Sequence, residues 1–445
     1  MARCCETNCR PALGVSRTAE YSAALPLERG EAAVQLRVTR SASVFRLLPQ
    51  RLEVLLHQWP RLTDLPRLRC GREWSLQHPA TVLNRSGMHD PYSLGSRAVV
   101  RLAYVVGVAA RAVLVTPLSG PLARFGKAGA SALALWADRC GVSLEVIDAY
   151  PSAASAIRAA EASRPDVVFG PYGSGPALAA AAASKGVVWN HGGATARLAR
   201  PAYPRVVNAE SPAYRYLAAV LETLVTEGLG EGSKVVIMHV DTGFGREVAE
   251  GAAVAARRLG LQRRSVTFRP GRARDVLAQV PAGDVLLSAG SFDDDVAIAQ
   301  WDSEYRWRAV GLVAAGVGEF RHAIGDLVER LYGPCQWFDD GTDDPADGPN
   351  SEWFSQCYRD ANGSEPPYPA AAAFAAGVVW QRCVKEAGTV ESLPVLAASQ
   401  QLDTTTLFGR FRVDPVTGVQ TGHQIRVVQW RRGQRVLVDR PLRRT

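Results

Sequence analysis

Residues 166–183 read DVVFGPYGSGPALAAAAA, an apolar β-branched run followed by a glycine-rich loop with one serine, Ser174, and by an alanine-rich helix. The unpaired N–H groups and the positive end of the helix dipole point at whatever lies over the loop. Gly173 and Gly175 let a ligand approach the backbone closely. This pattern predicts a site for a small anion, a carboxylate or a phosphate. In the alternative interpretation Ser174 only caps the helix and the glycines only turn the chain.

Strand-like apolar runs alternate with helix-length segments on both sides of this stretch. Such alternation predicts βαβ units, parallel sheets and right-handed crossovers, and hence an α/β fold of doubly wound sheets. The expected strands are Ala112–Thr116, Leu144–Ile147, Val167–Phe169, Val187–Asn190, Lys234–Val240, Arg264–Phe268, Val285–Leu287 and Ala309–Val313. The expected helices are Gly129–Cys140, Ala153–Ala162, Ala177–Lys185, Tyr214–Glu227, Arg246–Leu259 and Asp293–Tyr305.

Three loops that follow successive strands are rich in small and hydroxyl-bearing residues. They are Pro117–Gly126, the Ser174 loop and Asn190–Thr195. Because ligands of open α/β sheets bind at the carboxyl ends of the strands, these loops are expected to converge on one edge. This convergence favours binding over mere helix capping at Ser174. His191, beside the third loop, is either functional or a hydrogen-bonded structural histidine.

The composition indicates a globular protein with more than one domain. The chain has 445 residues, of which 47% are hydrophobic and 21% charged. This length predicts two or three domains. The net charge is +8, but residues 1–98 carry 14 Arg against 8 Asp and Glu, which leaves only about +2 for the rest. The main body is therefore not expected to bind nucleic acid.

The first 98 residues follow no sustained period and are interpreted as an N-terminal extension. They are a tail, a small module, or upstream sequence included by a wrong start codon. No secretory signal is visible in the chain as written, because the first 31 residues hold no uninterrupted apolar core. The apolar stretch Val99–Leu118 is broken by Arg101 and Arg111, so we expect no membrane span.

Metal and disulfide chemistry find little support in the sequence. Cys4, Cys5 and Cys9 lack a second ligand pair at zinc-like spacing. Cys335 and Cys357 could form a disulfide, although sequence alone does not establish the pairing. The acidic run over 339–348 departs from the calcium-loop pattern and is interpreted as a solvated loop. We expect neither a metal nor a cofactor.

Catalytic motifs are also missing from the sequence. There is no G-x-S-x-G, no H-E-x-x-H and no phosphate-binding loop ending in GK[ST]. The loop over 170–175 does not fit G-x-G-x-x-G, which disfavours a dinucleotide enzyme. We therefore expect no enzymatic activity.

Four segments together resemble the type 1 periplasmic binding proteins, in the leucine/isoleucine/valine-binding branch that serves ABC importers. They are PLSGPLARFG (117–126), GPYGS (170–174), GGAT (192–195) and TLFGRFRVDPVTGVQTGHQIRVVQW (406–430). The resemblance implies two α/β lobes joined by three hinge crossings, near Ser211, Gly333 and Gly422. After an extension over 1–111, lobe one would span 112–211 and 335–421, and lobe two 212–334 and 422–445.

The resemblance also implies roles for individual residues. Ser174 would bind the ligand's α-carboxylate, and Tyr172 would line the cleft. Gly193 and Thr195 would contact the carboxylate and the ammonium. From lobe two, the aromatic wall is expected from Phe244, and Ser291 and Phe292 occupy another ligand-facing region.

One position departs from the family pattern. The family places an acidic residue after the strand Ala309–Val313 to pair with the ligand ammonium, whereas this chain has Ala315 there. Either Glu319 or an acid of 293–295 substitutes, or the ligand is not a plain α-amino acid. The run Asp293–Asp295 is more simply explained as charges that match a helix N-terminus.

The sequence thus predicts a non-enzymatic receptor for a small carboxylate-bearing ligand, such as a branched-chain amino acid or a related amino acid or amide. The implied partner is an ABC transporter permease, and the implied location is extracytoplasmic. A cytoplasmic sensor of the same fold is the alternative, and a doubly wound α/β enzyme is a distant third.

Overall fold

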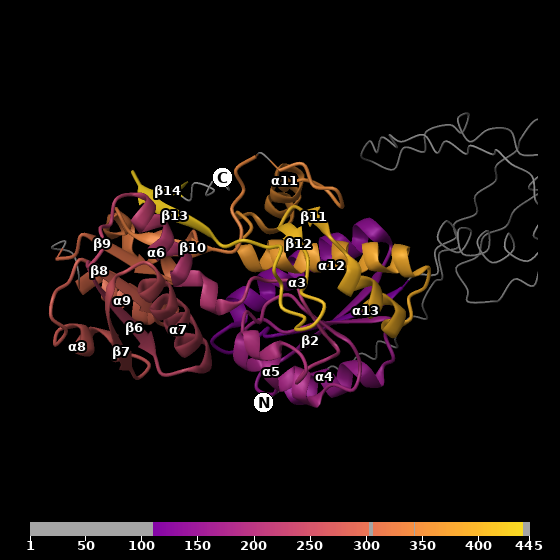
Figure 1. The fold of residues 1–445 in the computed structure, drawn as a ribbon. Helices are drawn as coiled ribbons and strands as arrows, with labels where there is room; N and C mark the ends of the chain where they lie inside the picture. The colour runs from indigo at the N-terminus through magenta and orange to yellow at the C-terminus, as the bar shows by residue number, and fades with distance from the viewer. Residues whose placement is uncertain (1–109, 302–305, 342, 439–445) are drawn as a thin grey trace, which may run out of the picture. The chain divides into compact units, whose positions relative to one another are not determined.

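The computed structural model describes residues 110–301, 306–341 and 343–438. In this part of the chain two α/β lobes are each built on their own sheet (Figure 1). The extension before residue 110, with Cys4, Cys5 and Cys9, lies outside the described residues. The predicted fold class is confirmed.

Lobe one is built on a five-stranded parallel sheet in the order β2-β1-β3-β4-β5. Its carboxyl edge collects the loops that follow the strands, because all the strands run in one direction. The strands are β1 (Arg111–Thr116), β2 (Ser143–Asp148), β3 (Val167–Gly170), β4 (Val188–Asn190) and β5 (Val206–Asn208). The connections contain α3 (Ala123–Cys140), α4 (Ala153–Ala162), α5 (Ser174–Ala183) and η2 (Ala196–Leu198).

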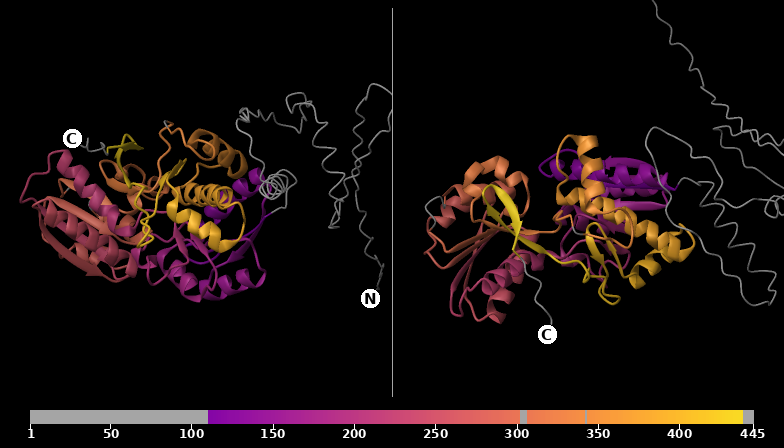
Figure 2. Two further views of the ribbon diagram at one scale, coloured as in Figure 1. Left: turned by 45° about the vertical axis from the view of Figure 1, so that its right-hand side comes forward. Right: turned by 90° about the horizontal axis from the view of Figure 1, so that it is seen from above.

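A later part of the chain returns to lobe one and completes its core. Helix α12 packs beside α3, far from it in sequence (Figure 1), and both views of Figure 2 keep the orange and yellow helices against the indigo and magenta part. Trp136 of α3 is fully buried and meets Trp380 of α12 edge to face, with ring centroids 5.8 Å apart. This return comprises α11 (Ser351–Asn362), α12 (Tyr368–Ala387), α13 (Ser392–Gln401), β11 (Thr404–Thr406) and β12 (Gly409–Phe411).

Lobe two is built on a seven-stranded sheet in the order β14-β13-β10-β9-β8-β6-β7. Strands β6 to β10 run parallel, and β13 and β14 extend the sheet in antiparallel fashion beyond β10. The strands are β6 (Lys234–Val240), β7 (Gln262–Phe268), β8 (Val285–Ala289), β9 (Ala309–Leu312), β10 (Tyr332–Cys335), β13 (Arg426–Arg431) and β14 (Gln434–Leu437). The helices are η3 (Ala213–Arg215), α6 (Tyr216–Thr226), α7 (Gly243–Arg258), α8 (Ala273–Leu277), α9 (Phe292–Trp301), η4 (Ala314–Gly316), α10 (Glu319–Ile324) and η5 (Gly325–Val328).

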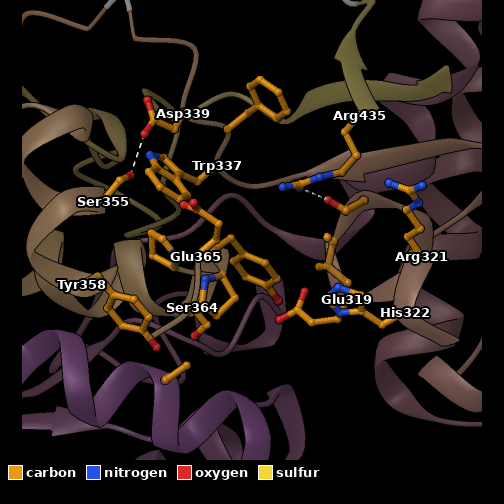
Figure 3. A pocket seen from close by; sticks show the side chains of 18 of the residues that line it. Glu319, Arg321, His322, Trp337, Asp339, Ser355, Tyr358, Ser364, Glu365 and Arg435 are labelled. Atoms are coloured by element: carbon orange, nitrogen blue, oxygen red, sulfur yellow. Dashed lines mark hydrogen bonds between the residues drawn. The ribbon is translucent and has the colours of Figure 1, made fainter. Parts of the chain in front are cut away.

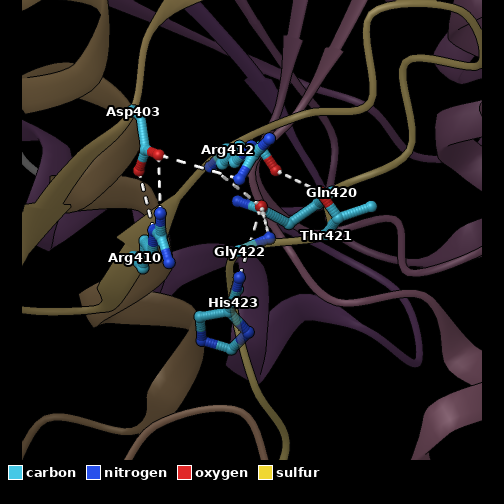
Figure 4. Close-up of polar contacts among 7 residues, drawn as sticks. All are labelled: Asp403, Arg410, Arg412, Gln420, Thr421, Gly422 and His423. Atoms are coloured by element: carbon cyan, nitrogen blue, oxygen red, sulfur yellow. Dashed lines mark hydrogen bonds and ion pairs between the residues drawn. The ribbon is translucent and has the colours of Figure 1, made fainter.

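The chain passes between the two sheets in three segments, and buried side chains tie these segments together. Ser211 Oγ donates to the carbonyl of His423 at 2.9 Å, and Gln336 Nε2 donates to the carbonyl of Ser211 at 2.9 Å. Gln420 Nε2 donates to the carbonyl of Ala209 at 3.2 Å. The side-chain oxygen Oε1 of Gln420 accepts backbone N–H groups of its own loop, as Figure 4 shows. The segments therefore form one hydrogen-bonded unit.

Helices α3, α5, α7 and α9 begin earlier than the sequence predicts, and for α3 and α7 the cause is local. The helix expected from Gly129 begins at Ala123. Gly126 looks like a turn residue, but within α3 it allows a close approach, because a Cβ there would lie 1.9 Å from the carbonyl oxygen of Pro117. The helix expected from Arg246 begins at Gly243, since Thr242 Oγ1 accepts the N–H of Gly245 at 3.1 Å.

The described residues contain neither a Cys335–Cys357 disulfide nor a helix suited to cross a membrane. Cys335 and Cys357 are separate thiols, and Cys335 Sγ donates to the carbonyl of Trp337 at 2.6 Å. None of the helices in the described ranges is both long and apolar enough to cross a membrane.

Candidate functional site

Ser174 is the first residue of α5, at the carboxyl edge of the lobe-one sheet. Gly173 occupies the N-cap position, and no side chain caps the helix. We find no hydrogen bond from the Ser174 hydroxyl to another described residue, so the capping alternative is not realised. The hydroxyl of Ser174 and the N–H groups of Ser174 and Gly175 remain available to a ligand, whereas Pro176 has no N–H and Ala177 N donates to the carbonyl of Gly173.

The loop after β4 is held rigidly by one buried side chain. Asn190 accepts the N–H of Gly193 through Oδ1 and donates to the Gly193 carbonyl through Nδ2, both at 2.8 Å. The same amide donates to Asn208 Oδ1 at the end of β5. The position of Thr195 is therefore set by the sheet edge itself.

Thr195 contacts the other lobe. Its hydroxyl donates to Glu247 Oε2 at 2.7 Å, and the N–H of Ala196 donates to Glu247 Oε1 at 2.7 Å. Burial raises the pKa of Glu247, while these two donors oppose the rise. Glu247 lies one turn beyond Phe244 on α7, and its role was not foreseen because no local pattern marks it.

Aromatic side chains surround the predicted site on both lobes. The Tyr172 ring lies 5.0 Å from that of Phe125, and its hydroxyl is 2.7 Å from the hydroxyl of Tyr368 on α12. Phe244 packs edge to face on Tyr216 with centroids 5.7 Å apart. Burial raises the pKa of Tyr172 and of Tyr216, so the hydroxyls of these two residues stay neutral.

Phe292 and Ser291 lie at the start of α9 in lobe two. The Arg124 guanidinium of lobe one lies 4.2 Å from the centroid of the Phe292 ring, a cation–π contact between the lobes. Ser291 is exposed, and its hydroxyl donates to Asp294 Oδ2 at 2.7 Å. The Ser291 side chain is thus engaged within its own turn.

The acidic residues that could substitute for an acid at position 315 lie in different surroundings. Ala315 is fully buried, and its carbonyl accepts Trp430 Nε1 at 2.8 Å. Asp295 accepts three hydrogen bonds inside lobe two, including one from Ala314 N at 2.9 Å, and Asp294 accepts the N–H of Gly271. Asp293 is exposed. Of the sequence-predicted substitutes, only Glu319 lines a cavity.

That cavity, of about 980 Å³, is lined by both lobes (Figure 3). Arg124 and Lys127 of α3 contribute positive charge from lobe one. The Glu319 carboxylate points into the cavity from α10, opposite Tyr358 (Figure 3). Burial and the charge of Glu319 raise the pKa of Tyr358 to about 12. The remaining aromatic lining comes from Trp337, Phe338, Tyr368 and Trp430.

The predicted residues therefore fall into two groups within the described part of the chain. Gly193 and Thr195 line a second void of only about 10 Å³, together with Glu210. Glu319 lines the large cavity, and Phe292 is joined to it through Arg124. Tyr172 connects the groups by its hydrogen bond to Tyr368, whereas Ser174 lines neither space.

Glu210 was not recognised in the sequence, because a single acid after a short strand carries no motif. It is 4% exposed, and its Oε1 atom has no hydrogen-bond partner among the described residues. Burial raises the pKa of this carboxyl well above its ordinary range.

The acidic run over 339–348 serves the fold. Asp343 accepts the N–H of Ser351 at 2.9 Å, and Asp347 accepts the Thr404 hydroxyl at 2.5 Å. Asp347 also pairs with Arg382, so this run is better bonded than the solvated loop that the sequence suggests. Among the described residues no cluster of His, Cys, Asp and Glu is suited to a metal ion.

Comparison with known proteins identifies the family. The family model "Periplasmic binding protein" matches residues 110–435, and the chain belongs to this family. A search of curated proteins finds no significant match.

Solved structures share the fold at low sequence identity. A leucine-binding protein from Thermotoga maritima is 16% identical with a TM-score of 0.62, over 74% of this chain and 97% of that one. A branched-chain amino acid transporter substrate-binding protein from Streptococcus pneumoniae, in complex with isoleucine, is 17% identical with a TM-score of 0.61, over 74% and 97%. An ABC transporter solute-binding protein from R. palustris, in complex with benzoate, is 16% identical with a TM-score of 0.62, over 74% and 95%. The predicted resemblance is confirmed.

Proposed function

We propose that this protein is a non-enzymatic receptor that holds a small carboxylate-bearing ligand between its lobes and delivers it to an ABC transporter permease. Closure of the lobes would bury the ligand and present both lobes to the permease. The same proposal places the chain outside the cytoplasm, where such receptors meet their permease.

One observation carries the proposal: a cavity lined by both lobes contains a cation, Arg124, that pairs with no acidic residue in the described part of the chain. Arg124 lies on the Phe292 ring, and no described carboxylate forms an ion pair with it. A guanidinium held flat by an aromatic ring keeps its N–H groups available to a carboxylate. In the structures of the same fold, the bound isoleucine and benzoate share only a carboxylate and an apolar body.

A thermal-shift screen tests the ligand class. The panel contains the twenty amino acids, their amides, dicarboxylates and benzoate. We expect at least one carboxylate to raise the melting temperature, and its uncharged amide counterpart to raise it less. Stabilisation by neutral compounds alone, or by none of the panel, would contradict the proposal.

Two arginine variants then test the site. Arg124→Ala should weaken binding of the best ligand about tenfold, since a hydrogen bond to a charged group contributes about 1.5 kcal/mol or more. Arg158→Ala removes an exposed arginine of α4 and should leave affinity unchanged. If the two variants weaken binding equally, Arg124 does not contact the ligand. Cell fractionation with N-terminal sequencing of the mature chain tests the location.

A further inference from the structure

Glu210 is a buried carboxyl whose Oε1 atom bonds to no described residue, and it lies at the edge of the lobe-one sheet where the predicted ligand contacts lie. It follows β5 by two residues, and it lines the same void as Gly193 and Thr195. Its exposed fraction is 4%, and Oε1 accepts no hydrogen bond from any described residue.

The groups around Glu210 include no cation that neutralises it. Its charge acts on Tyr172, Tyr216 and Tyr368, whose pKa values are raised by burial first and by Glu210 in addition. No Arg, Lys or His of the described chain forms an ion pair with Glu210. Tyr368 also lines the large cavity, so the tyrosines extend from Glu210 to the space between the lobes.

A carboxyl in this position is costly to the ligand-free protein. Removing an unpaired carboxylate from water costs several kcal/mol, and buried charges in proteins are normally paired with an opposite charge. The adjoining void of about 10 Å³ has the size of one water molecule. A primary ammonium group is about as large, and it brings the positive charge and N–H donors that Glu210 lacks.

We propose that Glu210 accepts the ammonium group of the bound ligand and so selects amino acids over hydroxy and keto acids of the same shape. This inference rests on the proposed function and deepens it. It also resolves the departure at position 315: the acidic partner comes from the end of β5, in lobe one, rather than from the loop after β9. The ligand carboxylate would then be left to Ser174 and Arg124.

The alternative acid, Glu319, differs in its surroundings. It is half-buried and faces the large cavity that also contains Arg124 and Lys127. A half-buried carboxylate that faces an open cavity keeps part of its hydration, so it needs a ligand cation less than Glu210 does. Glu319 is therefore the alternative ammonium partner that the test has to separate from Glu210.

The test compares matched pairs of ligands by isothermal titration calorimetry. The probes are the amino acid that stabilises the wild type most and its 2-hydroxy counterpart, for example leucine and 2-hydroxy-4-methylpentanoate. Glu210→Gln keeps the shape and removes the charge. It should weaken amino-acid binding about 10- to 100-fold, which is what one hydrogen bond to a charged group contributes, and leave the hydroxy acid within about threefold. Glu319→Gln should leave the ratio of the two affinities unchanged.

Each other result overturns the inference in a recognisable way. If Glu210→Gln retains the amino-acid preference, or if it weakens both ligands equally, Glu210 is not the ammonium partner. If Glu319→Gln abolishes the preference instead, Glu319 has that role. If no carboxylate binds the wild type, the proposed function itself fails, before any variant is compared.

A folding check and a second variant complete the design. Glu210→Gln should raise the melting temperature of the ligand-free protein, because it removes a buried ionisable group. Should it fail to fold, Glu210→Asp keeps the charge but withdraws it by one methylene. That variant should lower the ratio of amino-acid to hydroxy-acid affinity, and an unchanged ratio would contradict the inference.

Discussion

Thr195 and Glu247 join the two lobes directly, since the Thr195 hydroxyl donates to Glu247 Oε2 at 2.7 Å while the neighbouring Ala196 N–H donates to Oε1. The Thr195 hydroxyl, which the sequence assigns to ligand recognition, thus donates to a carboxylate of the protein itself. A ligand carboxylate that accepts from the Thr195 hydroxyl has to displace Glu247, because the hydroxyl has a single donor.

This contact predicts coupled effects in a double-mutant cycle. Thr195→Val and Glu247→Ala should each lower the free energy of unfolding by about 1–2 kcal/mol, because each leaves buried polar groups unpaired. The double variant should lose about 1 kcal/mol less than the sum. Urea denaturation of the four proteins measures the coupling. Strict additivity would show that the contact contributes no stability.

Ser174→Ala should weaken binding of the best carboxylate about tenfold and leave unfolding nearly unchanged, because the hydroxyl bonds to no described residue. Ser184→Ala, at the other end of α5, is the matched control. It removes a hydrogen bond to Glu161 and should lower stability without changing affinity. Calorimetric titration and denaturation of both variants provide the comparison. Unchanged affinity for every ligand in Ser174→Ala would disprove the carboxylate assignment.

Gly333→Ala should destabilise lobe two by about 3 kcal/mol, which is typical of overpacking that the backbone must absorb. A Cβ at Gly333 of β10 would lie 2.1 Å from the backbone nitrogen of Gly316 in η4. Gly230→Ala, where nothing lies within 4 Å, should change little. Melting temperatures of the two variants check this prediction, and a Gly333→Ala protein as stable as wild type would contradict the packing.

Asp295→Asn should lower the free energy of unfolding by about 2–3 kcal/mol. The carboxylate accepts from Ser288 and Gly290 through one oxygen and from Ala314 through the other. An amide presents N–H groups to at least one of these donors. Asp293→Asn, exposed in the same turn, should have an effect below about 0.5 kcal/mol. Chemical denaturation compares the two, and similar losses would count against the buried network.

The burial of His191 predicts that the protein loses stability in acid. His191 is fully buried with both ring nitrogens unpaired among the described residues, and burial lowers its pKa to about 4. Because the unfolded chain takes up the proton near pH 6.5, the stability that the neutral His191 contributes is complete above pH 6.5 and is lost as the pH falls towards 4. His191→Phe cannot take up a proton, so this variant should lack the pH dependence that His191 causes.

Between pH 7 and pH 5 the wild type should lose about 2 kcal/mol more than His191→Phe. The buried acids Glu210 and Asp295 have raised pKa values and act in the opposite direction, but they are present in both proteins. The difference between the two proteins therefore isolates this histidine. Denaturation at the two pH values measures it. Parallel pH profiles would show that His191 does not titrate differently on folding.

The fold was predictable because its signals are local. β-Branched runs such as Val167–Phe169, each followed by a helix-length segment, specify βαβ units without any long-range information. The family resemblance in four short segments then predicted that these units form two lobes of the periplasmic binding protein type. The helix boundaries at α3 and α7 were less predictable, since glycines such as Gly126 read as turns when they serve close packing.

The sequence by itself determined the class of protein and the glycine- and hydroxyl-rich loops at the carboxyl edge of lobe one. Tertiary structure alone decided which charged groups share a space. Glu247 reaches Thr195 from another lobe, Arg124 lies over Phe292, and Glu210 is buried beside tyrosines from three separate segments. Such contacts cannot be predicted from local sequence, because the burial of a charged group and the identity of its neighbours depend on how elements far apart in sequence pack together.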